Sequence, residues 1–183
     1  MPLTISFQLS DRDLEHFSAR MREARAKASE LGEGGILGST EKMLADVRNF
    51  EMPDFVRERI DTLELLVKIL KDDAWNLKGE DRSRIIDAIA YTADPQDMVP
   101  DHIPGIGLLD DAIMIELVSQ DLRHDVEAYQ DFCKYREREL ARRGTRGGPP
   151  TQTTYLETRR VQLHDRMRRR REALWATRGR SPF

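Results

Sequence analysis

The stretch "IDTLELLVKIL", from Ile60 to Leu70, decides the fold of this chain. Apolar residues recur in it at steps of three and four, which places them on one face of a helix: Ile60, Leu63, Val67 and Leu70. Leu66 and Ile69 widen that face. A broad apolar face is typical of a helix that other helices cover on several sides. The stretch therefore predicts a central helix, with Pro53 in its first turn.

Two helices are predicted before the central one. Ser10 is a good N-cap and is followed by acids in the first turn of the first helix. Its apolar seam continues at steps of three and four through Leu14, Phe17, Met21, Ala24, Ala28 and Leu31. The glycines of "GEGGILGST", residues 32–40, are expected to end this pattern, so that Ser39 or Thr40 caps a short second helix.

Helices are also predicted after the central one. Gly79 marks a turn, and the helix that follows presents Ile85, Ile86 and Ile89 to the core. A long helix is expected from about Asp110 to Leu140, with a seam made by Leu122, Val126, Tyr129, Cys133 and Leu140. The Gly/Pro-rich residues 144–153 are the clearest linker. Beyond them, four apolar residues fall within about 20° of one line on a helix: Leu156, Leu163, Met167 and Leu174.

These patterns predict an all-α fold, a small bundle of five or six helices with a Pro/Gly/Asp-rich loop between two core helices. We divide the chain into a helical domain (1–143), a linker (144–153) and a basic amphipathic C-terminal helix (154–183). The 39% of apolar residues is enough for one core of ordinary size.

The composition also limits where the chain works. Its longest apolar runs are far shorter than the roughly 20 residues of a membrane-spanning helix. The first residues show no basic and apolar signal-peptide pattern, so a cytoplasmic protein is expected. The single cysteine, Cys133, excludes an internal disulfide and is expected to pack in the core.

The stretch "DPQDMVPDHIPGIGLLDD", residues 94–111, is rich in residues that shape turns. Asp94 before Pro95 suits a helix N-cap followed by its first residue. Pro100 favours an extended backbone at the residue before it. Pro104-Gly105 has the form of a type II turn, and Gly107 favours a further tight turn. Asp110 and Asp111 stand where the long helix is expected to begin. Caps and turns therefore explain most of these residues.

The same stretch resembles the signature of the YkvA-like family, domain of unknown function 1232. An aromatic residue, Tyr91, precedes the pattern P-x-D-x-x-P-D-x-x-P-x-x-G-x-x-D-D, and the motif positions are Pro95, Asp97, Pro100, Asp101, Pro104, Gly107, Asp110 and Asp111. The resemblance covers some 40 to 60 residues, within a module of about residues 60–140. It implies a small helical module, often bacterial and sometimes found beside membrane-spanning segments, and it implies no particular reaction.

The acids of this stretch are candidate metal ligands. Mg²⁺ and Ca²⁺ prefer several oxygen ligands, which Asp97, Asp101, Asp110 and Asp111 would supply if the loop folds onto the helix start. His102 is a further candidate. Apart from such a divalent cation, no cofactor is expected. A metal site would allow metal-dependent phosphate-ester hydrolysis as an alternative function.

A second enzymatic alternative comes from the pair His124-Asp125, which resembles the His-Asp pair of helical phosphohydrolases. The pair occurs again as His164-Asp165, so it is weak evidence for a reaction. Because Leu122 and Val126 are expected in the core, His124 and Asp125 are expected on the flank of the helix.

The charge of the chain is uneven. From Ala141 onward 12 arginines face three acids, a net charge of +9, while the whole chain carries −3. Seven of these arginines are candidate contacts to a polyanion or a partner: Arg159, Arg160, Arg166, Arg168, Arg169, Arg170 and Arg171. The alternatives are nucleic-acid binding, docking of the helix on the acidic body or on a second copy, and binding to a membrane surface.

Taken with the acidic loop, this pattern favours a non-enzymatic interaction module over an enzyme. Its contacts would be the loop surface and the basic tail helix. The expected partner is another protein, or a second copy bound through the helix seams, with nucleic acid as an alternative at the tail.

Overall fold

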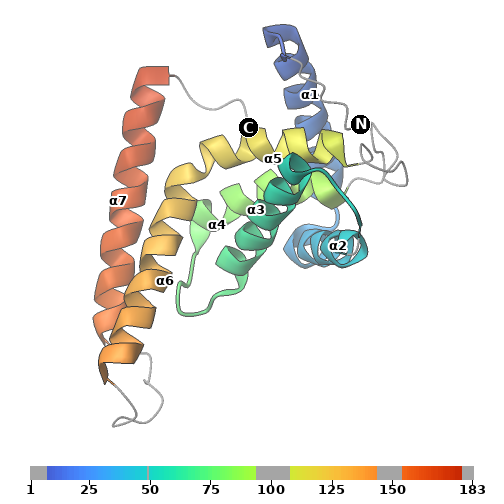
Figure 1. Cartoon of the computed structure of the whole chain (residues 1–183). Helices are drawn as coiled ribbons and strands as arrows, with labels where there is room; N and C mark the ends of the chain where they lie inside the picture. Colours follow the sequence, from blue (N-terminus) through green and yellow to red (C-terminus); the bar gives the residue numbers. More distant parts are fainter. Residues whose placement is uncertain (1–7, 49, 94–107, 144–153, 179–183) are drawn as a thin grey trace.

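The computed structural model describes residues 8–48, 50–93, 108–143 and 154–178. This part of the chain contains no strand, and its helices are α1 (Asp11–Ala28), α2 (Gly32–Val47), α3 (Asp54–Lys71), α4 (Gly79–Ile89), the short 3-10 helix η1 (Ala90–Ala93), α5 (Leu109–Asp121), α6 (Arg123–Arg143) and α7 (Thr154–Arg178). The predicted all-α fold is confirmed, and these described segments hold seven α-helices in place of the five or six expected. Figure 1 shows their arrangement. Over these residues no helix has the length and apolar character needed to cross a membrane.

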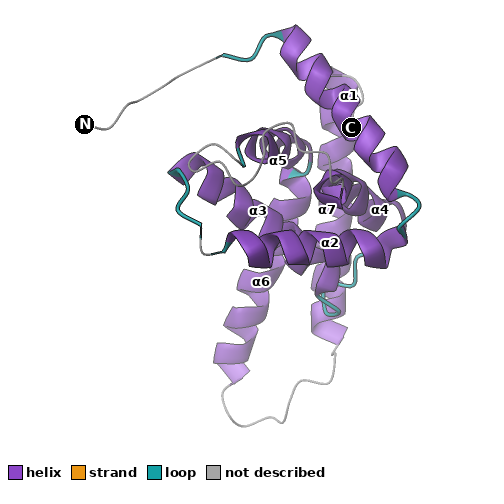
Figure 2. Ribbon diagram, turned by 90° about the vertical axis from the view of Figure 1, so that its right-hand side faces the viewer, coloured by secondary structure: helices purple, strands orange, loops and turns teal. Residues whose placement is uncertain are grey.

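α3 lies in the middle of the bundle and contacts α2, α4, α5 and α6 (Figure 2). The predicted core residues of this helix are all buried: Ile60, Leu63, Leu66, Val67, Ile69 and Leu70. Ile85, Ile86 and Ile89 of α4 are buried as predicted. The apolar face of the Ile60–Leu70 stretch therefore organises the core as the sequence indicates.

α1 begins at the predicted N-cap, Ser10, but ends at Ala28, before the last residue of the predicted apolar seam. The backbone N–H of Asp13 donates to Ser10 Oγ at 3.3 Å, and Asp13 Oδ2 accepts from the Ser10 backbone at 2.8 Å, which is a capping box. Phe17, Met21, Ala24 and Ala28 are buried, but Leu31 is exposed. The helix ends before Leu31 because Gly32 takes a left-handed φ of +65°.

The prediction for the glycine-rich segment is wrong in one respect. α2 begins at Gly32 and runs through Gly34, Gly35 and Gly38, so neither Ser39 nor Thr40 caps a helix. Thr40 is fully buried instead, where its hydroxyl donates to Ile36 O at 2.9 Å and meets Thr92 Oγ1 at 2.5 Å. Packing of α2 against α3, α4 and η1 offsets the low helix propensity of these glycines.

The predicted long helix is also corrected, because it is two helices that meet at Leu122. The backbone of Leu122 has φ −92° and ψ 6°, outside the helical region. No Gly or Pro marks this bend in the sequence. The change of direction keeps α5 against α3, while α6 runs down the side of the bundle to meet α7 (Figure 1). Of the predicted seam beyond the bend, Tyr129 is buried, Val126 and Cys133 are half-buried against the core, and Leu140 is exposed. Ala128 and Phe132 are buried in addition.

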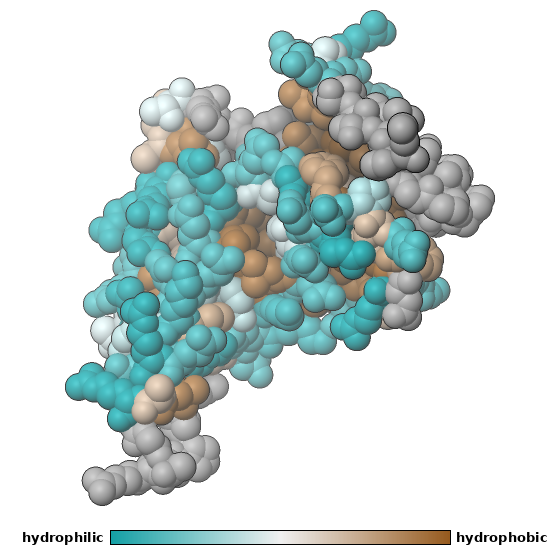
Figure 3. Space-filling view, viewed as in Figure 1, coloured by the Kyte–Doolittle hydropathy of each residue, from teal (hydrophilic) through white to brown (hydrophobic). Residues whose placement is uncertain are grey.

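α7 is an amphipathic helix packed along α6. The two lie side by side and extend beyond the rest of the bundle in both ribbon views (Figures 1 and 2). Leu156, Leu163 and Met167 are buried, and Leu174 is half-buried, in agreement with the predicted apolar line. Hydrophilic side chains cover most of the outer surface of this region (Figure 3).

Candidate functional site

The acidic motif lies mostly outside the described residues. This holds for Asp94, Pro95, Asp97, Pro100, Asp101, His102, Pro104, Gly105 and Gly107. Their roles as caps, turns or metal ligands therefore stay predictions. In the part of the chain that the structure describes, no group of three or more His, Cys, Asp or Glu side chains is placed to hold a metal ion.

Asp110 and Asp111 are the described end of the motif, in the first turn of α5. Asp110 is buried and Asp111 is half-buried. The motif's aromatic residue, Tyr91, lies beside them, and its hydroxyl donates to the Asp111 carbonyl oxygen at 3.4 Å. Burial, with the negative charges of Asp111 and Asp110, raises the pKa of Tyr91. This end of the motif thus joins η1 to the start of α5.

A buried carboxylate on α4 anchors the tail helix. Asp81 Oδ2 accepts from Arg168 Nε at 2.7 Å, and Asp81 Oδ1 accepts from Arg171 Nη2 at 2.7 Å. Burial alone would raise the pKa of Asp81, but the hydrogen bonds from Arg171 and Arg168 outweigh it and lower the pKa. This role was not predicted, because an acid in the first turn of a helix ordinarily interacts with the helix dipole.

Asp125 lies next to this anchor, and the prediction that it sits on the flank of its helix is wrong. It is 1% exposed in the first turn of α6, with Arg84 Nη1 at 3.4 Å and Arg171 Nη1 at 3.5 Å. Burial raises the pKa of Asp125 in spite of both guanidinium groups. His124 turns instead toward Glu127, with Nδ1 3.3 Å from Oε2. The two side chains of the His-Asp pair therefore do not converge on one site.

Six of the seven candidate arginines contact described groups of the body. Besides Arg168 and Arg171, Arg166 donates to Asp131 at 2.5 Å and Arg170 to Glu127 at 3.2 Å. Arg160 reaches the Ala74 carbonyl at 3.3 Å, and Arg159 lies over the Tyr135 ring, 5.6 Å from its centroid. Arg169 is exposed. The basic face of α7 is therefore largely used to hold the helix on the acidic body.

His164 is packed under the same helix. Its ring meets the fully buried Trp75 edge to face, with the ring centroids 4.2 Å apart. Burial lowers the pKa of His164 to about 4, and the nearby charge of Arg168 acts in the same direction. The imidazole is thus neutral near pH 7 and serves to pack α7.

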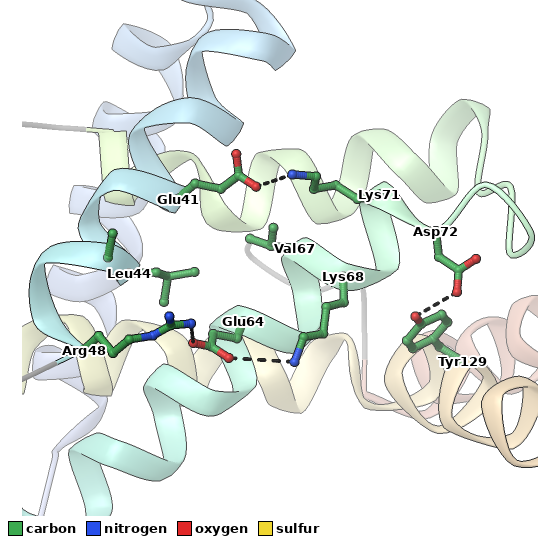
Figure 4. A pocket seen from close by; sticks show the side chains of 10 residues that line it. Glu41, Leu44, Arg48, Glu64, Val67, Lys68, Lys71, Asp72 and Tyr129 are labelled. Carbon is green, nitrogen blue, oxygen red and sulfur yellow. Dashed lines mark hydrogen bonds and ion pairs between the residues drawn. The ribbon is translucent and has the colours of Figure 1, made fainter.

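A groove between α2 and α3 is open to solvent. It has a volume of about 510 Å³ and is lined by Glu41, Leu44, Ala45, Arg48, Glu64, Val67, Lys68, Lys71, Asp72 and Tyr129. Ion pairs join its walls, Glu41 to Lys71 at one end and Arg48 to Glu64 at the other, 3.9 Å apart (Figure 4). Leu44 and Val67 form an apolar floor, and the small Ala45 is exposed between the charged ends.

Asp72 closes one end of the groove and ties it to α6. Its Oδ2 accepts from Tyr129 Oη at 3.0 Å and from Arg136 Nη1 at 2.8 Å. Its Oδ1 accepts from the backbone of Ala74 and Trp75, which shapes the turn after α3. Burial would raise the pKa of Asp72, but the hydrogen bonds, that from Arg136 foremost, lower it. This end is therefore held rigidly.

Sequence reasoning did not find the groove. Its lining residues recur at i, i+3, i+4 and i+7 on each helix, but most of them are charged and look like the ordinary solvent-exposed side of a helix. Each helix contributes only one wall, so the groove exists only once the two helices are packed.

Comparison with known proteins identifies one segment. A model of the family described as "Protein of unknown function (DUF1232)" matches residues 82–117, from α4 into α5, and confirms the predicted resemblance. No curated protein and no solved structure matches the chain. The α2–α3 groove and α7 both lie outside the matched segment.

Proposed function

We propose that this chain, whose residues 82–117 match the model of the DUF1232 family, is a protein-interaction module rather than an enzyme. The description of the family names no reaction. The proposal therefore has to be supported by the side chains of the chain itself, and above all by the solvent-open groove between α2 and α3.

The groove has the character of a binding surface. Its volume, about 510 Å³, falls in the range of sites that accept a bulky side chain or small ligand. Its apolar floor is bordered by charged side chains on both helices, an arrangement that allows desolvation at the centre and ion pairing at the rim. None of the lining residues is a histidine, cysteine or serine. These features favour recognition over covalent chemistry.

The basic tail helix is a weaker candidate for partner binding than its arginine content suggests. Arg166, Arg168 and Arg171 donate to carboxylates of the body. Phosphate groups of a nucleic acid would have to compete with those carboxylates. Nucleic-acid binding through α7 is therefore the weaker alternative, and the groove is the stronger candidate contact.

Site-specific photo-crosslinking tests the proposal. A photoreactive amino acid is placed at Ala45, which is exposed inside the groove, and the chain is irradiated in its source cells. We expect a discrete adduct with a protein, since a bound partner would lie against this position. The matched control carries the same amino acid at Lys134, an exposed position on α6 outside the groove. If position 45 gives no adduct beyond those of position 134, the proposal fails.

A further inference from the structure

The two walls of the groove have the same pattern. On α2 it is Glu41, Leu44, Ala45 and Arg48, and on α3 it is Glu64, Val67, Lys68 and Lys71, each at i, i+3, i+4 and i+7. The end-to-end ion pairs in Figure 4 require the two helices to run antiparallel. Two such stripes present parallel ridges with an apolar valley between them, the geometry into which a third helix packs.

The charged groups of the groove differ in how far they reach into solvent. The cationic side chains are the more exposed: Arg48 at 76%, Lys68 at 66% and Lys71 at 58%. The acidic side chains are less exposed, Glu41 at 44%, Glu64 at 33% and Asp72 at 13%. Asp72 is, in addition, already bonded to Arg136 and Tyr129. Arg48 and Lys68 pair with Glu64, and Lys71 pairs with Glu41. The cations therefore reach further into solvent than the acids beside them, and such exposed pairs can exchange an acid of the groove for one of a partner.

The acids still exclude a uniformly negative ligand. Glu41 and Glu64 stand among the three cations, so an evenly spaced chain of phosphates would be repelled at two points. An amphipathic helix avoids this repulsion. Its carboxylates can lie opposite the cations alone, while its apolar side chains cover Leu44, Ala45 and Val67. The described residues offer no strand edge to which an extended peptide would add.

From these observations we infer that the groove binds an acidic amphipathic helix of a partner protein. The helix inserts apolar side chains at i, i+3 and i+4 over Ala45, and its flanking carboxylates pair with Arg48, Lys68 and Lys71. This inference rests on the proposed function, since it names the chemistry of the partner at the same groove.

The test uses two labelled helical peptides and the full-length chain. Both peptides carry leucines at i, i+3, i+4 and i+7; one has glutamates on the flanks and the other has lysines at the same positions. Fluorescence anisotropy at low ionic strength measures the dissociation constants. We expect the glutamate peptide to bind at least ten times more tightly. Arg48→Glu combined with Lys68→Glu should weaken its binding about tenfold or more, about 1.4 kcal/mol.

The control changes the same charge elsewhere. Lys42→Glu with Lys134→Glu alters two exposed lysines that do not line the groove. Arg48→Gln with Lys68→Gln serves as the milder groove variant, and urea unfolding shows that each variant is folded. A control variant that weakens binding as much as the groove variant would attribute the attraction to net charge, and the inference would be overturned. The same holds if a single-stranded RNA binds the groove more tightly than the glutamate peptide.

The two proposals fail in different ways. Equal binding of the glutamate and lysine peptides, both blocked by Ala45→Trp, contradicts the acidic partner and leaves the groove as an interaction site. Absence of binding by either peptide, together with no adduct at position 45, contradicts the proposed function as well.

Discussion

The contact between α7 and the body and the groove between α2 and α3 both consist of ion pairs around an apolar strip, yet they differ in exposure. At the α7 contact the side chains of Asp81 and Arg171 are 4% and 7% exposed. In the groove the corresponding cations stand mostly in solvent. Buried pairs are costly to break because a charge is left without a partner, whereas exposed pairs contribute little to folding and can exchange partners. The difference separates a structural contact from a surface available for binding.

The largest effect is expected at the buried side of this comparison. Asp81→Ala removes the carboxylate that holds Arg168 and Arg171, and leaves the buried Arg171 with Asp125 alone. We expect the free energy of unfolding to fall by about 3–5 kcal/mol, the usual result of breaking a buried ion pair. Urea unfolding followed by circular dichroism measures it, and hydrogen exchange should show early loss of protection in α7.

Asp165→Ala is the control for this variant, because Asp165 is an exposed carboxylate 3.8 Å from Arg168 on the same helix. Its loss should cost no more than about 1 kcal/mol. If the Asp81 and Asp165 variants are equally stable, burial does not distinguish the two kinds of pair.

An intermediate effect is expected for His164 as the pH falls. Its pKa is about 4 in the folded chain and 6.5 as an unperturbed group, so the unfolded chain binds the proton more readily between these values. Stability should therefore decrease on acidification from pH 7, by up to about 2 kcal/mol at pH 5.

The measurement compares wild type with His164→Gln in urea at several pH values. The stability difference between the two should shift in favour of the variant as the pH is lowered from 7 to 5. His16→Gln, at an exposed position of α1, controls for the removal of a histidine. A difference that does not change with pH would contradict the buried, neutral state of His164.

The smallest effect is expected in the groove. A double-mutant cycle of Glu41→Ala and Lys71→Ala should give a coupling energy of roughly 0.2–1 kcal/mol that disappears at high salt. Urea unfolding of the four chains at low and high ionic strength measures it. A coupling of several kcal/mol would mean that the pair is structural and that its side chains are not free to bind a partner.

Local patterns were sufficient for much of the fold. The N-cap at Ser10, the apolar face of α3 and the isoleucines of α4 were predicted correctly, because each depends on neighbours within a few turns of one helix. The errors arose where packing overrides local preference. Glycines entered α2 because that helix is covered on several sides, and the bend at Leu122 has no local breaker to announce it.

The candidate site was less accessible from the sequence. The motif that suggested the family lies inside the matched segment, residues 82–117. The buried partners of the tail were not found, because Asp81 and Asp125 look like ordinary charged residues. Only the packing of α4, α6 and α7 together removes them from water and turns them into anchors.

The sequence by itself determined the helical class, the amphipathic tail and the family segment, since periodicity and motif spacing are properties of the chain alone. The tertiary structure decided what the charges do. Whether an arginine is an anchor or a contact for a partner depends on its burial and on the carboxylates beside it, and these come from helices distant in the sequence. The same residue types therefore hold α7 in place at one surface and leave a groove open to binding at another.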